Sequence, residues 1–126
     1  MQGALSGKRI LLVEDEYFIA ADLARALESE GAEILGPFSD VQRAQECADA
    51  AGIDVAVLDI NLEGARSYPV AEMLDARDVP YLFVTGYDEW ALPERFRDAP
   101  RLAKPFHMNM VIDEIARLVV RTGADP

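Results

Sequence analysis

Five short runs of apolar residues alternate along the chain with segments in which apolar residues recur every three or four positions. A short apolar run is typical of a buried strand, and the longer period is typical of an amphipathic helix. The sequence therefore predicts strands over residues 9–13, 33–36, 54–58, 80–84 and 101–103. It predicts helices from residue 18 to Gly31, from Ser39 to Gly52, from Pro69 to about Ala76, and from residue 108 to residue 119.

The predicted strands are apolar along nearly their whole length and do not alternate between apolar and polar residues. This pattern indicates a parallel sheet that is covered by helices on both faces. Right-handed crossovers then favour the strand order 2-1-3-4-5, so we expect a flavodoxin-like, doubly wound α/β fold. Residues 8–122 would form one domain, with short tails at residues 1–7 and 123–126.

Prolines and one capping signature modify this regular pattern. Pro37 is expected to end the second strand, and Ser39 opens a capping-box signature for the helix that follows. Pro69 fits best in the first turn of a helix, so the third helix should start late and be short. Pro93 interrupts residues 86–97, so a broken or frayed helix is expected in that segment.

Composition and charge narrow the class of protein. With 126 residues, the chain has room for one domain of ordinary size. No apolar run approaches the roughly 18 residues that cross a bilayer, and residues 1–7 lack the features of a signal peptide. We therefore expect a cytoplasmic protein without membrane contact. The net charge of −11 repels the phosphate backbone of nucleic acids, which argues against nucleic-acid binding.

Polar residues follow four of the predicted strands directly. They are Glu14-Asp15, Asp59, Thr85-Gly86 and Lys104-Pro105. The carboxyl ends of parallel strands meet at one edge of the sheet, which is where open α/β folds bind ligands. Carboxylates suit a hard cation such as Mg²⁺, and a hydroxyl with an ammonium suits a phosphoryl group. The sequence thus predicts a phosphoryl site with a cation at this edge.

Each of these residues has a specific chemical use and an ordinary alternative. Asp59 is the candidate nucleophile, because a carboxylate can accept a phosphoryl group to form an acyl phosphate. Taken singly, Asp59 and the acids at positions 14–16 are equally well explained as residues at helix N-termini. The backbone of Gly86 can approach an anion. Lys104 precedes Pro105, a candidate for a cis peptide bond that would direct the lysine inward.

The same residues resemble the receiver domain of two-component response regulators, from about residue 8 to residue 121. The resemblance rests on four motifs in this order: Leu12-Val13-Glu14-Asp15, Leu58-Asp59-Ile60-Asn61, Val84-Thr85-Gly86 and Lys104-Pro105-Phe106. It implies that Asp59 accepts the phosphoryl group and that Thr85 and Lys104 contact it. It also implies a site for Mg²⁺ or Mn²⁺ formed by Glu14, Asp15, Asp59 and the main-chain carbonyl of Asn61. The implied partner is a histidine kinase or a histidine phosphotransfer protein, and the implied state is a monomer or weak dimer.

Two departures from the commonest receiver pattern concern the readout of phosphorylation. Receivers usually carry an aromatic residue three positions before the lysine, where this chain has Arg101. The stretch from Pro80 to Tyr87 resembles the Phe-Ala-Thr-Gly-hydrophobic-Tyr subfamily, typically stand-alone receivers that work with kinases of the histidine-tryptophan-glutamate class. We therefore expect Tyr87 and residues 88–96 to form the moving part. Trp90 in that segment is either a core residue or a partner contact.

Other classes of function remain open. A non-phosphorylated docking module, or pseudo-receiver, would be expected to lack an acceptor residue, and none is missing. A phosphatase of the aspartyl-phosphate type typically carries a second acid two residues after its nucleophile, where this chain has Asn61. A nucleotide-binding flavodoxin-like module would need a glycine-rich loop after the first strand, where this chain is acidic. We predict a stand-alone receiver that catalyses only its own phosphorylation and dephosphorylation, and that signals through protein contacts or acts as a phosphate sink.

Overall fold

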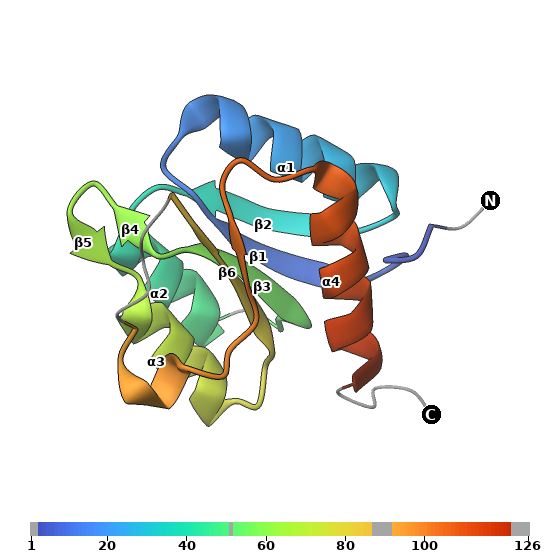
Figure 1. Ribbon diagram of the computed structural model, residues 1–126. Coiled ribbons are helices and arrows are strands. Elements are labelled where there is room, and N and C mark those ends of the chain that lie inside the picture. Colours follow the sequence, from blue (N-terminus) through green and yellow to red (C-terminus); the bar gives the residue numbers. More distant parts are fainter. Residues whose placement is uncertain (1–2, 51, 87–91, 122–126) are drawn as a thin grey trace.

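The computed structural model describes residues 3–50, 52–86 and 92–121 and is built around a five-stranded sheet (Figure 1). All neighbouring strands in this sheet are parallel, and their order is β2-β1-β3-β6-β7. This is the predicted order 2-1-3-4-5. The strands are β1 (Arg9–Val13), β2 (Glu33–Phe38), β3 (Val55–Asp59), β6 (Tyr81–Thr85) and β7 (Arg101–Ala103).

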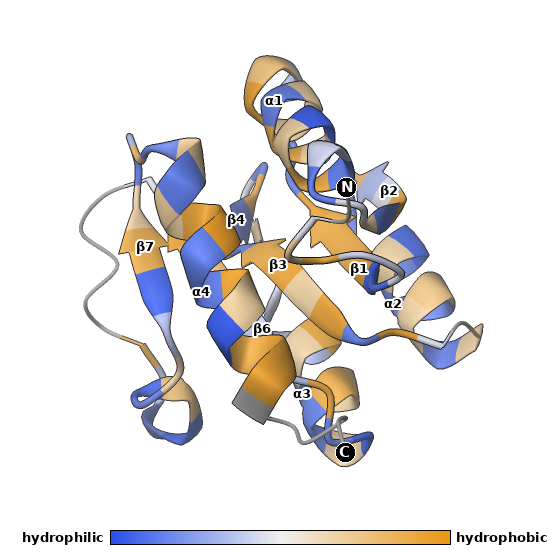
Figure 2. Ribbon diagram, turned by 90° about the vertical axis from the view of Figure 1, so that its right-hand side faces the viewer, coloured by the Kyte–Doolittle hydropathy of each residue, from blue (hydrophilic) through white to orange (hydrophobic). Residues whose placement is uncertain are grey.

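Helices cover both faces of the sheet, as the apolar strands predicted. The first face packs against α1 (Tyr17–Ser29) and α4 (Met108–Arg121), and the second packs against α2 (Val41–Ala50) and α3 (Tyr68–Ala76) (Figure 1). Successive residues of a strand point to opposite faces, so β1 contributes to two separate cores. Ile10 and Leu12 pack on the first face, whereas Leu11 and Val13 pack on the second. Figure 2 shows the apolar strands lying between helices that carry polar residues outward.

The second strand does not end at Pro37, contrary to the prediction. It continues to Phe38, and its register against β1 shifts between Leu11 and Val13. The shift in register accommodates Pro37, which has no N–H group to donate. Pairing resumes where the Glu14 N–H donates to the Phe38 carbonyl at 2.9 Å. Gly36 permits the irregularity, because its φ is +110° and an added Cβ would lie 2.7 Å from the Leu12 carbonyl oxygen. The Gly36–Pro37 peptide bond is cis.

The cap of α2 lies one residue later than predicted. Asp40, and not Ser39, provides the capping oxygen, because its Oδ1 accepts the Arg43 N–H at 2.8 Å. The helix begins at Val41, so Asp40 occupies the position where a side-chain oxygen reaches the exposed amides of the first turn. The described part of the helix runs to Ala50, and residue 51, which precedes the predicted stop at Gly52, lies outside the described residues.

The connection after β3 is irregular, and α3 is short and starts late, as predicted. The helix begins at Tyr68 with Pro69 in its first turn. The preceding residues form a two-stranded antiparallel hairpin that the sequence did not predict, composed of β4 (Asn61–Leu62) and β5 (Ala65–Arg66). Asn61 opens this hairpin two positions after Asp59, the last residue of β3.

The connection between β6 and β7 contains a single 3₁₀ turn, η1 (Glu94–Phe96), and no α-helix among its described residues. Phe96 fixes this turn to the sheet, since its ring lies 5.7 Å from that of Phe83 and 5.2 Å from that of Tyr68, measured between centroids. Arg95 fixes it to α3 through an ion pair with Asp75 at 2.9 Å. An irregular segment was expected here; residues 87–91 lie outside the described part of the chain.

Residues 3–7, within the segment expected to be a tail, pack against the end of α1. The side chain of Leu5 is fully buried in the core on the α1 and α4 face. The Leu5 N–H donates to the Glu30 carbonyl at 3.0 Å. Among the described helices, none has the length and apolar character needed to cross a membrane.

Candidate functional site

The polar residues that end the central strands gather at one edge of the sheet. Glu14 follows β1, Asp59 ends β3, Thr85 ends β6 and Lys104 follows β7. The main chain joins the last two, because the Lys104 N–H donates to the Thr85 carbonyl at 2.7 Å. A cleft of about 380 Å³ opens at this edge, lined by Asp15, Glu16, Asp59, Asn61, Glu63, Gly86 and Lys104.

Three carboxylates form the acidic part of this cleft. Glu14, Asp15 and Asp59 each offer an oxygen, and these oxygens lie within 4.8 Å of one another. Glu14 and Asp59 are only 2% and 3% exposed, whereas Asp15 is half-buried. Asp59 Oδ1 accepts the Asn61 N–H at 3.3 Å, which orients the carboxylate at the end of β3.

Lys104 connects this acidic group to the neighbouring helix terminus. Its Nζ lies 2.9 Å from Glu14 Oε2, 3.1 Å from Glu16 Oε1 and 3.3 Å from Asp59 Oδ2. An ammonium group has three N–H donors, and these three acceptors match them in number. The Lys104–Pro105 peptide bond is cis. The lysine side chain is 12% exposed, so its charge lies inside the cleft and not in bulk solvent.

The surroundings shift the pKa values of both Asp59 and Lys104. Burial raises the pKa of Asp59 to about 8, and the neighbouring Glu14 carboxylate adds to this increase, while Lys104 opposes it. Burial alone would lower the pKa of Lys104, but its hydrogen bond to Glu14 and the charges of Asp59 and Glu14 outweigh burial and raise it. Lys104 is therefore permanently protonated. Its single positive charge does not balance the negative charges of the carboxylates in the pocket of Asp59.

The acidic group fits a small divalent cation. Mg²⁺ prefers carboxylate and carbonyl oxygens, and the three carboxylates supply such a donor set. In addition, Glu14 Oε1 is buried and has no hydrogen-bond partner among the described residues. A buried carboxylate oxygen without a partner is costly, and a bound cation would satisfy it.

Thr85 and Gly86 lie at the end of β6, where the sequence predicted a contact with a phosphoryl group. The Thr85 Oγ1 is buried, and no described residue forms a hydrogen bond with it. Gly86 follows Thr85 on the wall of the cleft, and no atom of the described residues outside its chain neighbours lies within 4 Å of the position that a Cβ would take there. The open space at the end of β6 therefore lies beside Gly86, next to the buried Thr85 hydroxyl.

Glu16 and Glu63 are cleft residues that the sequence reasoning missed, and Glu16 is the one that contacts Lys104. It was treated only as one of several acids at a helix N-terminus, yet its carboxylate contacts Lys104. The run Glu14-Asp15-Glu16 was a visible signal, but nothing local distinguishes the third acid from a capping residue. The predicted residues Tyr87 and Trp90 lie outside the described part of the chain. Arg101 lies in β7 opposite Phe83 and is exposed.

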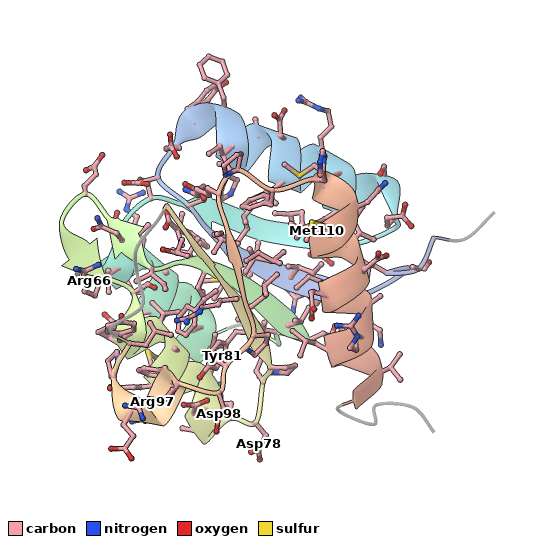
Figure 3. The ribbon with its side chains drawn as sticks, viewed as in Figure 1. Arg66, Asp78, Tyr81, Arg97, Asp98 and Met110 are labelled. Carbon is pink, nitrogen blue, oxygen red and sulfur yellow. The ribbon has the colours of Figure 1, made fainter. Side chains whose placement is uncertain are left out.

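A second cavity, of about 390 Å³, lies at the opposite, amino-terminal edge of the sheet. Asp78, Tyr81 and Asp98 mark its place in Figure 3. The Tyr81 hydroxyl donates to Asp75 at 2.9 Å, and burial with this contact raises the pKa of Tyr81. Pro80 and Tyr81, which open the stretch that resembles the subfamily motif, line this cavity, whereas the predicted phosphoryl and cation residues do not.

A cluster of carboxylates with a partly buried lysine, at the carboxyl edge of a 2-1-3-4-5 sheet, is an arrangement that suits a phosphoryl-type anion together with a cation. The chain belongs to the response regulator receiver domain family, whose pattern it matches over residues 10–116. Receiver domains are signalling modules of two-component systems and interact with histidine kinases or phosphotransfer proteins.

Individual relatives are similar over most of this chain. It is 35% identical over 118 residues to the transcriptional regulatory protein PdtaR of Mycobacterium tuberculosis, a match that covers 90% of this chain and 58% of PdtaR. The chain thus spans little more than half the length of that relative. It is 30% identical over 119 residues to the response regulator receiver protein CpdR of Brucella abortus, covering 90% of this chain and 98% of CpdR. The solution structure of SdrG from Sphingomonas melonis Fr1 superposes with a TM-score of 0.79 at 43% identity, over 94% of this chain and 99% of SdrG.

Proposed function

We propose that this chain accepts a phosphoryl group on Asp59 from a histidine kinase or a histidine phosphotransfer protein. The observation that carries the proposal is the contact between a buried carboxylate and a partly buried ammonium at the cleft, Asp59 Oδ2 to Lys104 Nζ at 3.3 Å. The carboxylate is a nucleophile, and the ammonium lies where charge on a transferred phosphoryl oxygen would develop.

In the proposed transfer, one Asp59 oxygen forms a bond to phosphorus while the bond from phosphorus to the donor's imidazole nitrogen breaks. The imidazole leaves with its electron pair, and the product is an acyl phosphate on Asp59. Lys104 exchanges its contact with Asp59 for one with a phosphoryl oxygen. The Thr85 hydroxyl, which has no hydrogen-bond partner among the described residues, and the Gly86 amide donate hydrogen bonds to the other phosphoryl oxygens.

A cation has a defined place in this proposal. Bound Mg²⁺ supplies neutralisation of the charge on the phosphoryl oxygens. The residues that would hold it are Glu14, Asp15, Asp59 and the main-chain carbonyl of Asn61. Their fit rests on the clustered carboxylate oxygens and on the unpaired Glu14 Oε1.

We also propose that the chain works as a stand-alone receiver of the Phe-Ala-Thr-Gly-hydrophobic-Tyr subfamily, in the cytoplasm, as a monomer or weak dimer. Support comes from the similarity to CpdR and SdrG, each matched over nearly its whole length. The short, late α3 and the single 3₁₀ turn before β7 also agree with this assignment. The kinase partner would then be of the histidine-tryptophan-glutamate class. The output is a protein contact or the removal of phosphoryl groups from other receivers.

The readout in this proposal lies in residues 86–97, with Tyr87 and Trp90, and not at Arg101. A phosphoryl group adds negative charge and acceptor oxygens next to Thr85, and it shifts an existing equilibrium of the following segment. Amide hydrogen exchange of residues 86–97, with and without a phosphoryl mimic, tests this. Identical exchange in both states would exclude this segment as the readout.

Phosphorylation itself is tested by incubating the protein with acetyl phosphate and Mg²⁺ and measuring the intact mass. We expect a gain of one phosphoryl group in the wild type and in the control Asp113→Asn, an exposed aspartate on α4. We expect no gain in Asp59→Asn. A wild type that gains no mass would support the docking-module alternative. Steady hydrolysis of unrelated phosphoesters would support a phosphatase, against which Asn61 argues at present.

A further inference from the structure

Glu16 occupies an unusual place in the cleft. Its main chain is held on both sides, because its N–H donates to Glu14 Oε2 at 3.1 Å and its carbonyl accepts the Ala20 N–H at 2.9 Å. Its side chain is 61% exposed but reaches inward, so that Oε1 lies 3.1 Å from Lys104 Nζ. Glu16 therefore ties the first turn of α1 to the residue that follows β7, although 88 positions separate the two residues.

Glu16 differs from the other two acids that contact Lys104. Glu14 and Asp59 belong to the carboxylate group that fits a cation, and Asp59 also reacts in the proposed transfer. When the cation is bound, or when Asp59 has reacted, these two acids interact with the cation or the phosphoryl group as well as with Lys104. Their attraction for the lysine is then weaker. Glu16 lies outside that carboxylate group, so neither change gives its carboxylate a partner that competes with Lys104.

We propose that Glu16 is a positioning residue that keeps the Lys104 ammonium over Asp59 during phosphoryl transfer. This inference rests on the proposed function of Asp59. A lysine side chain has four flexible carbon–carbon bonds, and its charge is a point charge without fixed direction. Glu16 restricts it by accepting one of its three N–H groups, which leaves the others directed at Glu14 and at the Asp59 side of the cleft.

Positioning and simple charge make opposite predictions for this residue. A negative charge at the cleft repels an anionic phosphoryl donor, so its removal would accelerate phosphorylation if charge were the whole effect. Loss of positioning would slow phosphorylation. Glu16→Ala removes both the charge and the acceptor, whereas Glu16→Gln removes the charge and keeps an acceptor oxygen.

The test measures the rate of phosphorylation by acetyl phosphate with Mg²⁺ in the full chain. We expect Glu16→Ala to be slower than wild type by about 3- to 10-fold, which is the size expected for one hydrogen bond. We expect Glu16→Gln to restore most of that loss. Glu63→Gln removes another charge that lines the cleft and measures the effect of charge alone. In a Lys104→Ala background, Glu16→Ala should have no further effect, because the group it positions is absent.

A second measurement does not depend on phosphorylation. The ammonium signal of Lys104 in nitrogen-15 NMR should be shifted and should exchange faster with solvent in Glu16→Ala than in wild type. An unchanged signal, or a Glu16→Ala rate at or above that of wild type, would overturn the positioning role. If wild type accepts no phosphoryl group at all, the proposed function of Asp59 fails, while the NMR comparison still decides whether Glu16 holds Lys104.

Discussion

Replacing Asp59 by asparagine should stabilise the protein in the absence of divalent cations. Asp59 is 3% exposed, and burial with the nearby Glu14 charge raises its pKa from 3.8 to about 8. The folded state therefore keeps a proton that the unfolded chain releases near pH 4. Between these two pKa values the folded state binds more protons, so stability falls as the pH rises through this window.

The size of this stabilisation follows from the difference between the two pKa values of Asp59, in the unfolded and in the folded state. Each pH unit changes the free energy of unfolding by about 1.4 kcal/mol, so the three units from pH 4 to pH 7 set an upper limit of about 4 kcal/mol. Asparagine carries no charge to bury, and Lys104 keeps Glu14 and Glu16 as partners in the variant. Because the pairing of Asp59 with Lys104 is lost, we expect a net gain of roughly 1–3 kcal/mol at pH 7.

Urea unfolding at several pH values between 4.5 and 8, in the presence of a chelator, measures this effect as the difference between Asp59→Asn and wild type. The difference should be small near pH 4.5 and should grow with pH. Taking the difference removes the contributions of the other ionisable groups, which both proteins share. A variant that is less stable than wild type at pH 7, or a difference that shrinks as the pH rises, would refute the electrostatic account of the cleft.

Three further outcomes follow from the described contacts. Mg²⁺ at 100 times its Kd should raise the free energy of unfolding of wild type by about 2.7 kcal/mol, measured by thermal or urea unfolding. Asp15→Asn should remove most of this gain. If Mg²⁺ stabilises both proteins equally, the cation binds elsewhere. Phe96→Ala should lower the free energy of unfolding by about 3 kcal/mol, because a fully buried ring that packs on Phe83 is lost. A loss below about 1 kcal/mol would mean that η1 is not fixed to the core. Ser67→Ala should raise the free energy of unfolding by about 1 kcal/mol, because the buried hydroxyl of Ser67 has no partner among the described residues. This is expected even though Ser67 directly precedes α3, where a serine often caps a helix. A loss of that size in urea unfolding would instead reveal a capping role.

Much of the fold follows from local pattern alone. β1 is apolar on both sides, with Leu11 on one face and Leu12 on the other, so it can be buried only between two layers of helices. The right-handedness of the crossovers then restricts the strand order. The place of the site follows for the same reason. Residues that end parallel strands, such as Asp59 and Thr85, must meet at one edge whatever the side-chain details.

Other local signals were ambiguous because they depend on one or two residues of context. Pro37 removes an N–H group, but whether this ends a strand or creates a bulge depends on the neighbouring strand. Ser39 and Asp40 are both good capping residues, and the choice between them depends on where α2 packs. The hairpin of β4 and β5 consists of two-residue strands, which are too short to show a period in sequence.

The sequence by itself determined the parallel sheet, its order and the edge at which Asp59 lies, because strand periodicity and chain handedness act locally along the chain. Only the tertiary structure decided which acids contact Lys104 and which oxygen atoms remain without partners. Those contacts join residues that are 45 to 90 positions apart. Their distances depend on how the helices and strands pack together, and no local pattern in the sequence contains that information.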